Sequence, residues 1–313
     1  MNNLKIIFVN WTKPFFYKDQ FTGYRKFIHD SRLISSEYSM PDHEIVMQAA
    51  AITSAKKYGK CPVKLFTDDC GYEYYKKINL ISLFDEVDVD VLNTVNNDQN
   101  INPAQFWTSG KIISICKEKP PFIFIDLDLI IKDYIPDWLN NYDLVHTHWE
   151  ICRGPLYVNF WQLKEYGIEM DEFDEKMMIP NTSFLFINDQ KILDKYLKLH
   201  MQLVNKQYGY VPDWLWLMSD QYILGYIIRE LELNVAEITN KVFMQYSDEP
   251  HNREKPGYIP DWIEIEGIIK NTPKIPYEHV WMTKGFLARE AERRNKKVSE
   301  WNEIILNNRF NIT

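Results

Sequence analysis

The sequence predicts an α/β fold in which a central, mostly parallel sheet is flanked by helices. Apolar runs of strand length alternate with helical segments through the first half of the chain, which is the order expected of parallel β-α-β units. The run Phe122–Ile125 is apolar throughout, as expected of a strand that is covered on both faces. With 313 residues, 45% of them hydrophobic, the chain is long enough to bury a substantial core.

The elements predicted in the first half begin with a strand at residues 4–9. Pro41 opens a helix that ends near Gly59, because proline suits the first turn of a helix and glycine its end. Further strands are expected at residues 63–67, 84–89 and 122–125, and further helices at residues 72–78 and 103–116.

The second half follows the same pattern less regularly. Strands are predicted at residues 143–147 and 182–187, and helices at residues 190–206 and 213–231.

Two segments near the end of the chain are more polar. Residues 244–271 are rich in proline, tyrosine and charge, and form either a loop that closes over a substrate or an ordinary surface excursion. A charged helix is expected over residues 285–308, with its basic side chains on a solvated face and docking to a membrane or partner as the alternative. These side chains are Arg293, Arg294, Lys296 and Lys297.

Composition excludes several classes of protein. The formal net charge of -8 argues against nucleic-acid binding, because neutralising phosphates needs a basic surface. The cysteines are widely and irregularly spaced, which indicates neither a zinc cluster nor a disulfide framework and fits a reducing, cytoplasmic location. The apolar run at residues 4–9 is too short for a signal peptide core or a membrane span, so no transmembrane segment is expected. Peripheral membrane attachment and the oligomeric state stay open.

Two carboxylates, Asp126 and Asp128, follow the apolar strand at residues 122–125 directly, with Leu127 between them. Open α/β sheets bind ligands at the carboxyl ends of their strands, where these side chains lie. From a turn, both carboxylates can reach one hard cation, and Mn²⁺ or Mg²⁺ bound by few protein oxygens keeps positions free for diphosphate oxygens. The alternative is that Asp126 caps the following segment and Asp128 is solvated. No glycine-rich dinucleotide or P-loop motif occurs, so phosphates must be held in another way.

This context resembles the GT-A superfamily of nucleotide-sugar glycosyltransferases, distantly its glycogenin-like branch, in which a D-x-D motif follows an apolar strand of a Rossmann-like core. In the family, a helix that contacts the donor precedes this strand, and residues 106–111, which end in Lys111, match it. The resemblance implies transfer of a sugar from a nucleotide-sugar donor, most commonly a UDP-sugar. It implies Mn²⁺ or Mg²⁺ at Asp126 and Asp128, with Leu127 beside the donor.

The resemblance also implies a domain organisation. A single catalytic domain is expected over residues 1–284, with a nucleotide-sugar half at residues 1–128 and an acceptor half at residues 129–284. A C-terminal helix over residues 285–313 would extend this domain.

Three later segments extend the resemblance. Asn181 opens a segment similar to the family's Asn-Thr/Ser-Gly strand at the acceptor site, although Ser183 stands where glycine is common. Asp220, in a segment like the family's Asp-Gln helix start, is the implied acceptor-side carboxylate, either a general base or an orienting group. His279 is implied to complete the metal site, and Lys284 to contact the donor diphosphate. The alternatives are, in the same order, a turn amide, a helix cap, a structural histidine and a solvated surface lysine.

For the base and ribose, the resemblance indicates the end of the first strand and the acidic turn after the second. The residues concerned are Asn10, Trp11, Thr12, Asp68 and Asp69. An acidic side chain there can accept hydrogen bonds from uracil or ribose. The alternative is ordinary strand-end turn chemistry, which is favoured more for Asp69 than for Asp68.

Two other functions compete with glycosyl transfer. A metal-dependent hydrolase is suggested by His146 and His148, whose side chains project to one face of a strand, but no H-E-x-x-H arrangement supports it. A non-catalytic carbohydrate-binding protein on a transferase fold is the other alternative, against which the intact acidic pair argues. The sequence does not identify the sugar or the stereochemical outcome of the transfer. It does not identify the acceptor either, which is a glycan, a lipid-linked intermediate, a protein or a small molecule.

Overall fold

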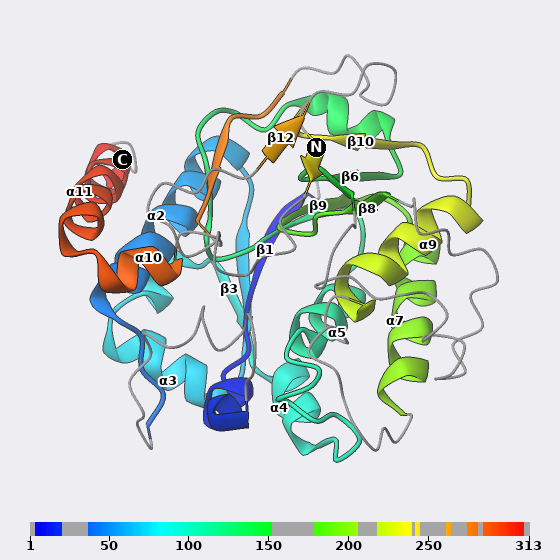
Figure 1. The fold of residues 1–313 in the computed structure, drawn as a ribbon, viewed down its shortest axis with the longest axis horizontal. Coiled ribbons are helices and arrows are strands. Elements are labelled where there is room, and N and C mark those ends of the chain that lie inside the picture. Colours follow the sequence, from blue (N-terminus) through cyan, green and yellow to red (C-terminus); the bar gives the residue numbers. More distant parts are fainter. Residues whose placement is uncertain are drawn as a thin grey trace.

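A computed structural model describes residues 4–20, 37–151, 178–205, 218–239, 242–244, 261–263, 274–280 and 284–309. These residues contain a 7-stranded sheet with the strand order β10-β6-β9-β4-β1-β2-β3, covered by helices on both faces (Figure 1). Its strands are β1 (Lys5–Asn10), β2 (Val63–Thr67), β3 (Glu86–Asp88), β4 (Phe122–Ile125), β6 (Leu144–His146), β9 (Phe184–Ile187) and β10 (Val235–Glu237).

The sheet is parallel except at one strand. β1 pairs in parallel with β2 and β4, and β2 pairs in parallel with β3. β9, from the second half of the chain, lies antiparallel between β4 and β6, and β10 pairs in parallel with β6. The predicted α/β fold with a mostly parallel central sheet is therefore confirmed, and a single sheet runs through both halves of the chain.

Successive side chains of the central strands point to opposite faces of the sheet, and so they pack into two different cores. Phe122 and Phe124 of β4 point into one core, whereas Ile123 and Ile125 point into the other. All four side chains are at most 1% exposed. Since successive side chains of a strand point to opposite faces, a continuous apolar run is what a strand covered on both faces requires.

The helices form one layer on each face of the sheet (Figure 1). One face is covered by α4 (Asp90–Asn97), α5 (Ser109–Lys117), α7 (Gln190–Val204) and α9 (Ile223–Glu230), and the other by α2 (Asp42–Gly59) and α3 (Asp69–Lys77). Short 3-10 segments lie at η1 (Lys13–Gln20), η2 (Ile81–Leu83) and η3 (Asp137–Asn141), and a π-helical turn, η4 (Met218–Tyr222), leads into α9.

Two small sheets accompany the central one. In the first, the strand order is β12 (Asp261–Ile263), β11 (Val242–Met244), β7 (Trp149–Ile151) and β8 (Met178–Pro180). The second pairs β13 (Tyr277–His279) antiparallel with β5 (Leu129–Ile131). The sequence predicted neither β5 nor β13. Within the predicted loop at residues 244–271, residues 261–263 form β12, and residues 245–260 and 264–271 lie outside the described part of the chain.

The predicted helix at residues 103–116 is wrong in its first half, because α5 begins only at Ser109. The Asn102 side chain accepts from the backbone N–H of Ala104 at 2.9 Å, and the Asn102 carbonyl accepts from the N–H of Phe106 at 2.9 Å. An asparagine whose side chain accepts from the backbone N–H two residues further on favours a turn over a continuing helix.

Three other helical segments differ from the sequence prediction. α4 was not predicted, and α3 begins at Asp69 rather than at residue 72, because the Asp68 side chain caps it by accepting from the N–H of Gly71. Of the helix predicted at residues 213–231, residues 213–217 lie outside the described part, and the rest consists of η4 and α9.

The C-terminal segment is two helices, α10 (Lys284–Arg289) and α11 (Ala291–Arg309), rather than one. Trp301 of α11 is fully buried against α2, in a small third core. Two of the basic residues expected on a solvated face serve the fold instead. Arg294 donates to the carbonyls of Leu287 and Ala288, and Lys297 pairs with Glu278 at 2.9 Å.

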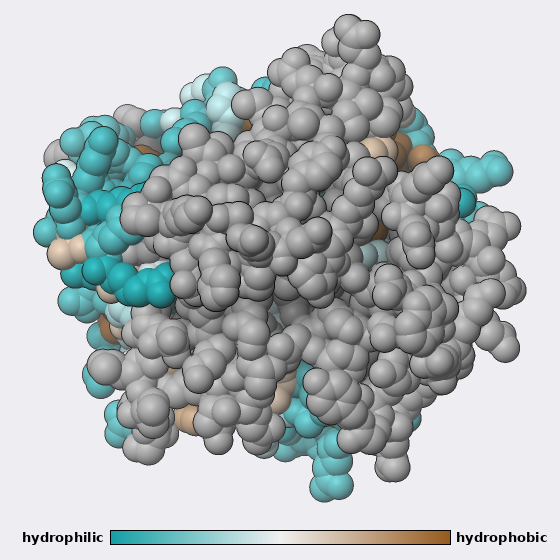
Figure 2. Space-filling model, in the orientation of Figure 1, coloured by the Kyte–Doolittle hydropathy of each residue, from teal (hydrophilic) through white to brown (hydrophobic). Residues whose placement is uncertain are grey.

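The surface over α10 and α11 is hydrophilic where it is described (Figure 2). Its exposed residues include Glu292, Asn295, Lys296 and Ser299. Within the part of the chain that the structure describes, no helix combines the length and the apolar character that crossing a bilayer needs.

The burial of His200, in the α7 helix from the second half of the chain, can be tested by the pH dependence of stability. Neither of its ring nitrogens has a hydrogen-bond partner among the residues that the structure describes, and burial lowers its pKa from 6.5 to about 3. Between these two values the unfolded chain binds a proton that the folded chain does not, so stability falls as the pH falls. We expect His200→Leu to remove about 2 kcal/mol of the stability loss between about pH 7 and about pH 5, measured by urea denaturation. Burial also lowers the pKa of His146 to about 3. His146 therefore contributes to the loss of stability equally in the wild type and in the variant. Equal losses in the two proteins would contradict this assignment.

Candidate metal centre and donor site

The site is built on the turn between β4 and β5. The backbone N–H of Asp126 donates to the carbonyl of Ser183 at 2.8 Å, which ties the start of this turn to the residue before β9. The N–H of Leu129 donates to the carbonyl of Asp126 at 3.0 Å and closes the turn. Leu127 packs against the core, so Asp126 and Asp128 point away from it. The two carboxylates are therefore presented at the carboxyl end of a central strand.

His279 reaches this turn from the far end of the chain. In the pairing of β13 with β5, His279 lies opposite Leu129, and the N–H of Val280 donates to the carbonyl of Asp128 at 3.0 Å. The Nε2 atom of His279 lies 3.6 Å from Oδ1 of Asp128. Potential ligand atoms of Asp126, Asp128 and His279 all lie within 4.8 Å of one another. Among the described residues, this is the group of His, Cys, Asp and Glu side chains that converges as a cation site.

Two lysines compensate the two carboxylates. Lys284, the first residue of α10, lies with Nζ 2.5 Å from Oδ2 of Asp128, and Lys111 lies with Nζ 3.6 Å from Oδ1 of Asp126. Burial favours a raised pKa for Asp128, but Lys284 and His279 outweigh it and hold that pKa well below its usual range. Burial raises the pKa of Asp126, and Lys111 offsets this increase only in part. The neighbouring carboxylates of Asp128 and Asp220 raise the pKa of Asp126 further.

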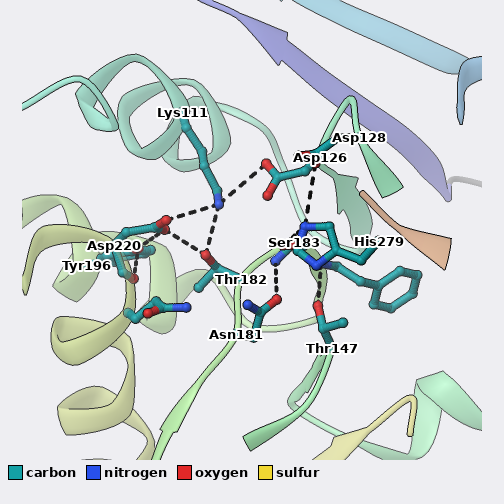
Figure 3. Close-up of polar contacts among 12 residues, drawn as sticks. Lys111, Asp126, Asp128, Thr147, Asn181, Thr182, Ser183, Tyr196, Asp220 and His279 are labelled. Atoms are coloured by element: carbon teal, nitrogen blue, oxygen red, sulfur yellow. Dashed lines mark hydrogen bonds and ion pairs between the residues drawn. The ribbon is translucent and has the colours of Figure 1, made fainter. Parts of the chain in front are cut away.

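Lys111 also joins the metal centre to the predicted acceptor side (Figure 3). From the N-terminal turn of α5, its ammonium donates to Oγ1 of Thr182 at 2.8 Å and to Oδ2 of Asp220 at 3.2 Å. Thr182 donates to the other oxygen of Asp220 at 2.9 Å, and the Tyr196 hydroxyl donates to the Asp220 carbonyl. Burial alone would lower the pKa of Lys111, yet Asp126 and Asp220 raise it. Thr182 and Tyr196 had not been predicted as site residues.

Asn181 positions its neighbours through both ends of its amide. Its oxygen accepts from the N–H of Ser183 at 3.1 Å, and its nitrogen donates to Oε1 of Glu150 at 2.7 Å. Gln221 donates to the same glutamate oxygen at 3.4 Å. Glu150 is only 2% exposed and was missed by the sequence analysis. The available signal was a charged residue between two apolar ones in Trp149–Ile151, which predicts nothing about its partners.

The residues predicted for the base and ribose lie together at the ends of β1 and β2. Asp68 is 1% exposed and accepts from the backbone N–H and the hydroxyl of Thr12, in addition to capping α3. Asn96 donates to Asp68 at 3.2 Å and accepts from the indole of Trp11 at 2.6 Å. Asp68 therefore orders the loop after β1, and Asp69 is the exposed first residue of α3. Direct contact of these residues with a nucleotide stays a prediction.

Trp11 also brings this loop against Gly110, at the start of α5. A Cβ atom added to Gly110 would lie 2.6 Å from Cβ and Cγ of Trp11, which is closer than real side chains approach. The absence of a side chain at Gly110 is therefore what lets the loop after β1 pack directly on the start of α5. Asn10 lies beside this loop, where its side-chain oxygen accepts from the hydroxyl of Tyr38 at 3.0 Å.

The histidine pair of the hydrolase alternative is arranged differently. His146 and His148 are at most 1% exposed, and Nδ1 of His146 lies 3.0 Å from the carbonyl of His148. Nε2 of His148 lies 3.3 Å from Glu150. Burial and the neighbouring His148 lower the pKa of His146 to about 3. Neither histidine joins the converging acidic group, so the geometry favours a structural role for the pair.

Comparison with known proteins gives matches in structure only. No protein-family model matches the chain, and no curated protein sequence matches it. A structure described as PaToxG glycosyltransferase shares 11% identity and a TM-score of 0.40, over 72% of this chain and 69% of that one. The galactosyltransferase LgtC, solved with donor and acceptor sugar analogues, shares 12% identity and a TM-score of 0.40, over 96% and 99%. Mouse xyloside xylosyltransferase 1 shares 13% identity and a TM-score of 0.36, over 75% and 83%.

A nucleoside-diphosphate-sugar pyrophosphorylase from Vibrio cholerae is also similar, with 8% identity and a TM-score of 0.35, over 78% of this chain and 93% of that one. With at most 13% identity and TM-scores of at most 0.40, these matches assign no activity to this chain.

The buried position of Lys111 between two carboxylates can be tested by stability. Lys111→Met keeps the length of the side chain but leaves Asp126 and Asp220 without their shared cation. We expect a loss of about 3 kcal/mol in the free energy of unfolding, because breaking a buried ion pair leaves its partners uncompensated. Lys132→Met is the matched control, since Lys132 is 47% exposed and pairs with Glu278 at the surface. Its expected loss is below about 1 kcal/mol. Urea denaturation measures both, and equal losses would contradict the assigned role of Lys111.

Proposed function

We propose that this protein is a metal-dependent glycosyltransferase that moves a sugar from a nucleotide-sugar donor, with a UDP-sugar favoured, to an acceptor hydroxyl. One observation carries the proposal: Asp126, Asp128 and His279 converge at the carboxyl end of β4, with Lys111 and Lys284 beside them. This edge of an α/β sheet is where such folds bind ligands, and the site combines a cation-binding group with positive charge suited to a diphosphate.

The donor set fits a divalent cation. Two carboxylates and one imidazole are suited to Mn²⁺, and also to Mg²⁺ through the oxygens, and they leave coordination positions free for phosphate oxygens. When bound, the cation supplies Lewis-acid stabilisation of the negative charge that develops on the departing nucleoside diphosphate. Because the site already balances two carboxylates with two lysines, a bound cation changes the partners of these lysines.

Lys284 is the residue most affected by that change. Its ammonium pairs with Asp128. With Asp128 engaged by a cation, Lys284 would be the residue that contacts a phosphate oxygen of the donor and adds to the stabilisation of the leaving group.

On the acceptor side, we assign Asp220 an orienting and electrostatic role. Its carboxylate accepts from Lys111 and Thr182, which fixes its direction and occupies both of its oxygens. A carboxylate held in this way is better placed to orient a sugar and to stabilise positive charge at the reacting carbon than to accept a proton. Asn181 acts as a positioning residue, because both ends of its amide are bound to Glu150 and Ser183.

The central test is calorimetric titration of UDP and of GDP into the protein, with Mn²⁺ or with a chelator. We expect binding of UDP that requires Mn²⁺ and is lost in Asp126→Ala/Asp128→Ala, because the phosphates reach the protein through the cation. Asp133→Ala/Asp137→Ala, which removes two exposed carboxylates, is the control and should bind as the wild type does. Nucleotide binding that survives both the chelator and the first double substitution would overturn the proposal, and so would the absence of any nucleotide binding.

A second prediction separates the cation from the donor. In Lys284→Ala, Mn²⁺ alone should bind at least as tightly as in the wild type, because the lysine no longer competes for Asp128. UDP in the presence of Mn²⁺ should bind about ten-fold more weakly, because one phosphate contact is lost. Lys296→Ala, at an exposed position of α11, should change neither affinity. Weaker binding of Mn²⁺ alone would show that Lys284 instead supports the metal centre.

A further inference from the structure

Ser183 places a hydroxyl beside the candidate metal centre. Its Oγ atom lies 3.0 Å from Nε2 of His279, which is the ring nitrogen nearest to Asp128 (Figure 3). The side chain is buried, with 4% of the residue exposed. In the resembled family, this position is commonly glycine, which has no side chain to place there.

The backbone around Ser183 leaves its side chain little freedom. The N–H donates to the side chain of Asn181 at 3.1 Å, and the carbonyl accepts from the N–H of Asp126 at 2.8 Å. The next residue, Phe184, pairs with Ile125 in the central sheet. Ser183 is therefore fixed relative to the acidic turn by the same strands that fix the turn itself, and the rotation of its hydroxyl-bearing bond is what remains free.

The distance between Ser183 and His279 has the value found between neighbouring ligands of one cation. In octahedral coordination with bonds of about 2.1 Å, ligand atoms at right angles lie about 3.0 Å apart. The same distance also suits a hydrogen bond between the hydroxyl and the imidazole. Ser183 thus either positions His279 from outside the metal centre or adds an oxygen to it.

We propose that the hydroxyl of Ser183 is a further ligand of the cation held by Asp126, Asp128 and His279, an inference that rests on the metal centre of the proposed function. The neutral oxygen adds a hard donor without adding charge, which suits a site where Asp126 already lies among other carboxylates. Four ligands from the protein would leave room in the coordination of the cation for phosphate oxygens of a nucleoside diphosphate.

Changing the donor atom tests the proposal directly. Ser183→Cys replaces a hard oxygen by a soft sulfur at the same position, so a direct ligand shifts the preference of the site toward a thiophilic cation. Mn²⁺ and Cd²⁺ are titrated into the full chain by calorimetry without nucleotide. We expect the ratio of Cd²⁺ to Mn²⁺ affinity to rise at least about ten-fold over the wild type, with an absorption band from sulfur-to-cadmium charge transfer. An unchanged ratio without the band would overturn the proposal, since a residue that only positions His279 leaves the set of ligand atoms unchanged.

Matched variants complete the experiment. Ser54→Cys adds a thiol at another buried serine, in α2, and should leave the metal preference as it is in the wild type. Ser183→Gly removes the hydroxyl without adding bulk, and it should admit one more water to bound Mn²⁺, measured by water-proton relaxation. Unchanged hydration in Ser183→Gly would count against the proposal even if the cysteine variant failed to fold. Cation binding that is lost in Asp126→Ala/Asp128→Ala but insensitive to both changes at Ser183 would overturn this inference alone. No cation binding to the wild type would overturn the metal centre as well.

Discussion

The arrangement of the site depends on one electrostatic constraint: carboxylates concentrated at the end of a buried strand must be matched by positive charge. In a medium of low dielectric, neighbouring carboxylates repel strongly and lose hydration, so they are stable only with cations close by. Lys111 matches Asp126 and Asp220, whereas Lys284 matches Asp128. These lysines come from α5 and α10, which are far apart in the chain. The charge balance therefore connects the central sheet with elements from two distant parts of the sequence.

Backbone pairing supplies the geometry that the charges exploit. The acidic turn is held by Ser183 on one side and by the pairing of β5 with β13 on the other. These contacts fix peptide groups, so the backbone that carries the carboxylates, the imidazole of His279 and the hydroxyl of Ser183 is held in place by the fold. Preorganised groups of this kind stabilise developing charge without reorganising during the reaction.

The polar residues around the centre fall into two groups with different physical roles. Asp68 and Asn181 are buried and form hydrogen bonds mainly to neighbouring protein groups, which makes them supports for the loop after β1 and the segment before β9. Asp126 and Lys284 keep 30% and 20% of their side chains exposed, and they are the groups that a ligand can reach.

The sequence by itself determined six of the seven strands of the central sheet, all but β10, and the position of the acidic pair after one of them. Strand periodicity and the apolar run Phe122–Ile125 are local signals, and the place of Asp126 and Asp128 follows from them directly. The pairing of β13 with β5, the double contact of Lys111 and the roles of Ser183 and Glu150 were decided only by the tertiary structure. The physical reason is that these features depend on contacts between segments distant in sequence, and local periodicity carries no information about which distant groups will meet.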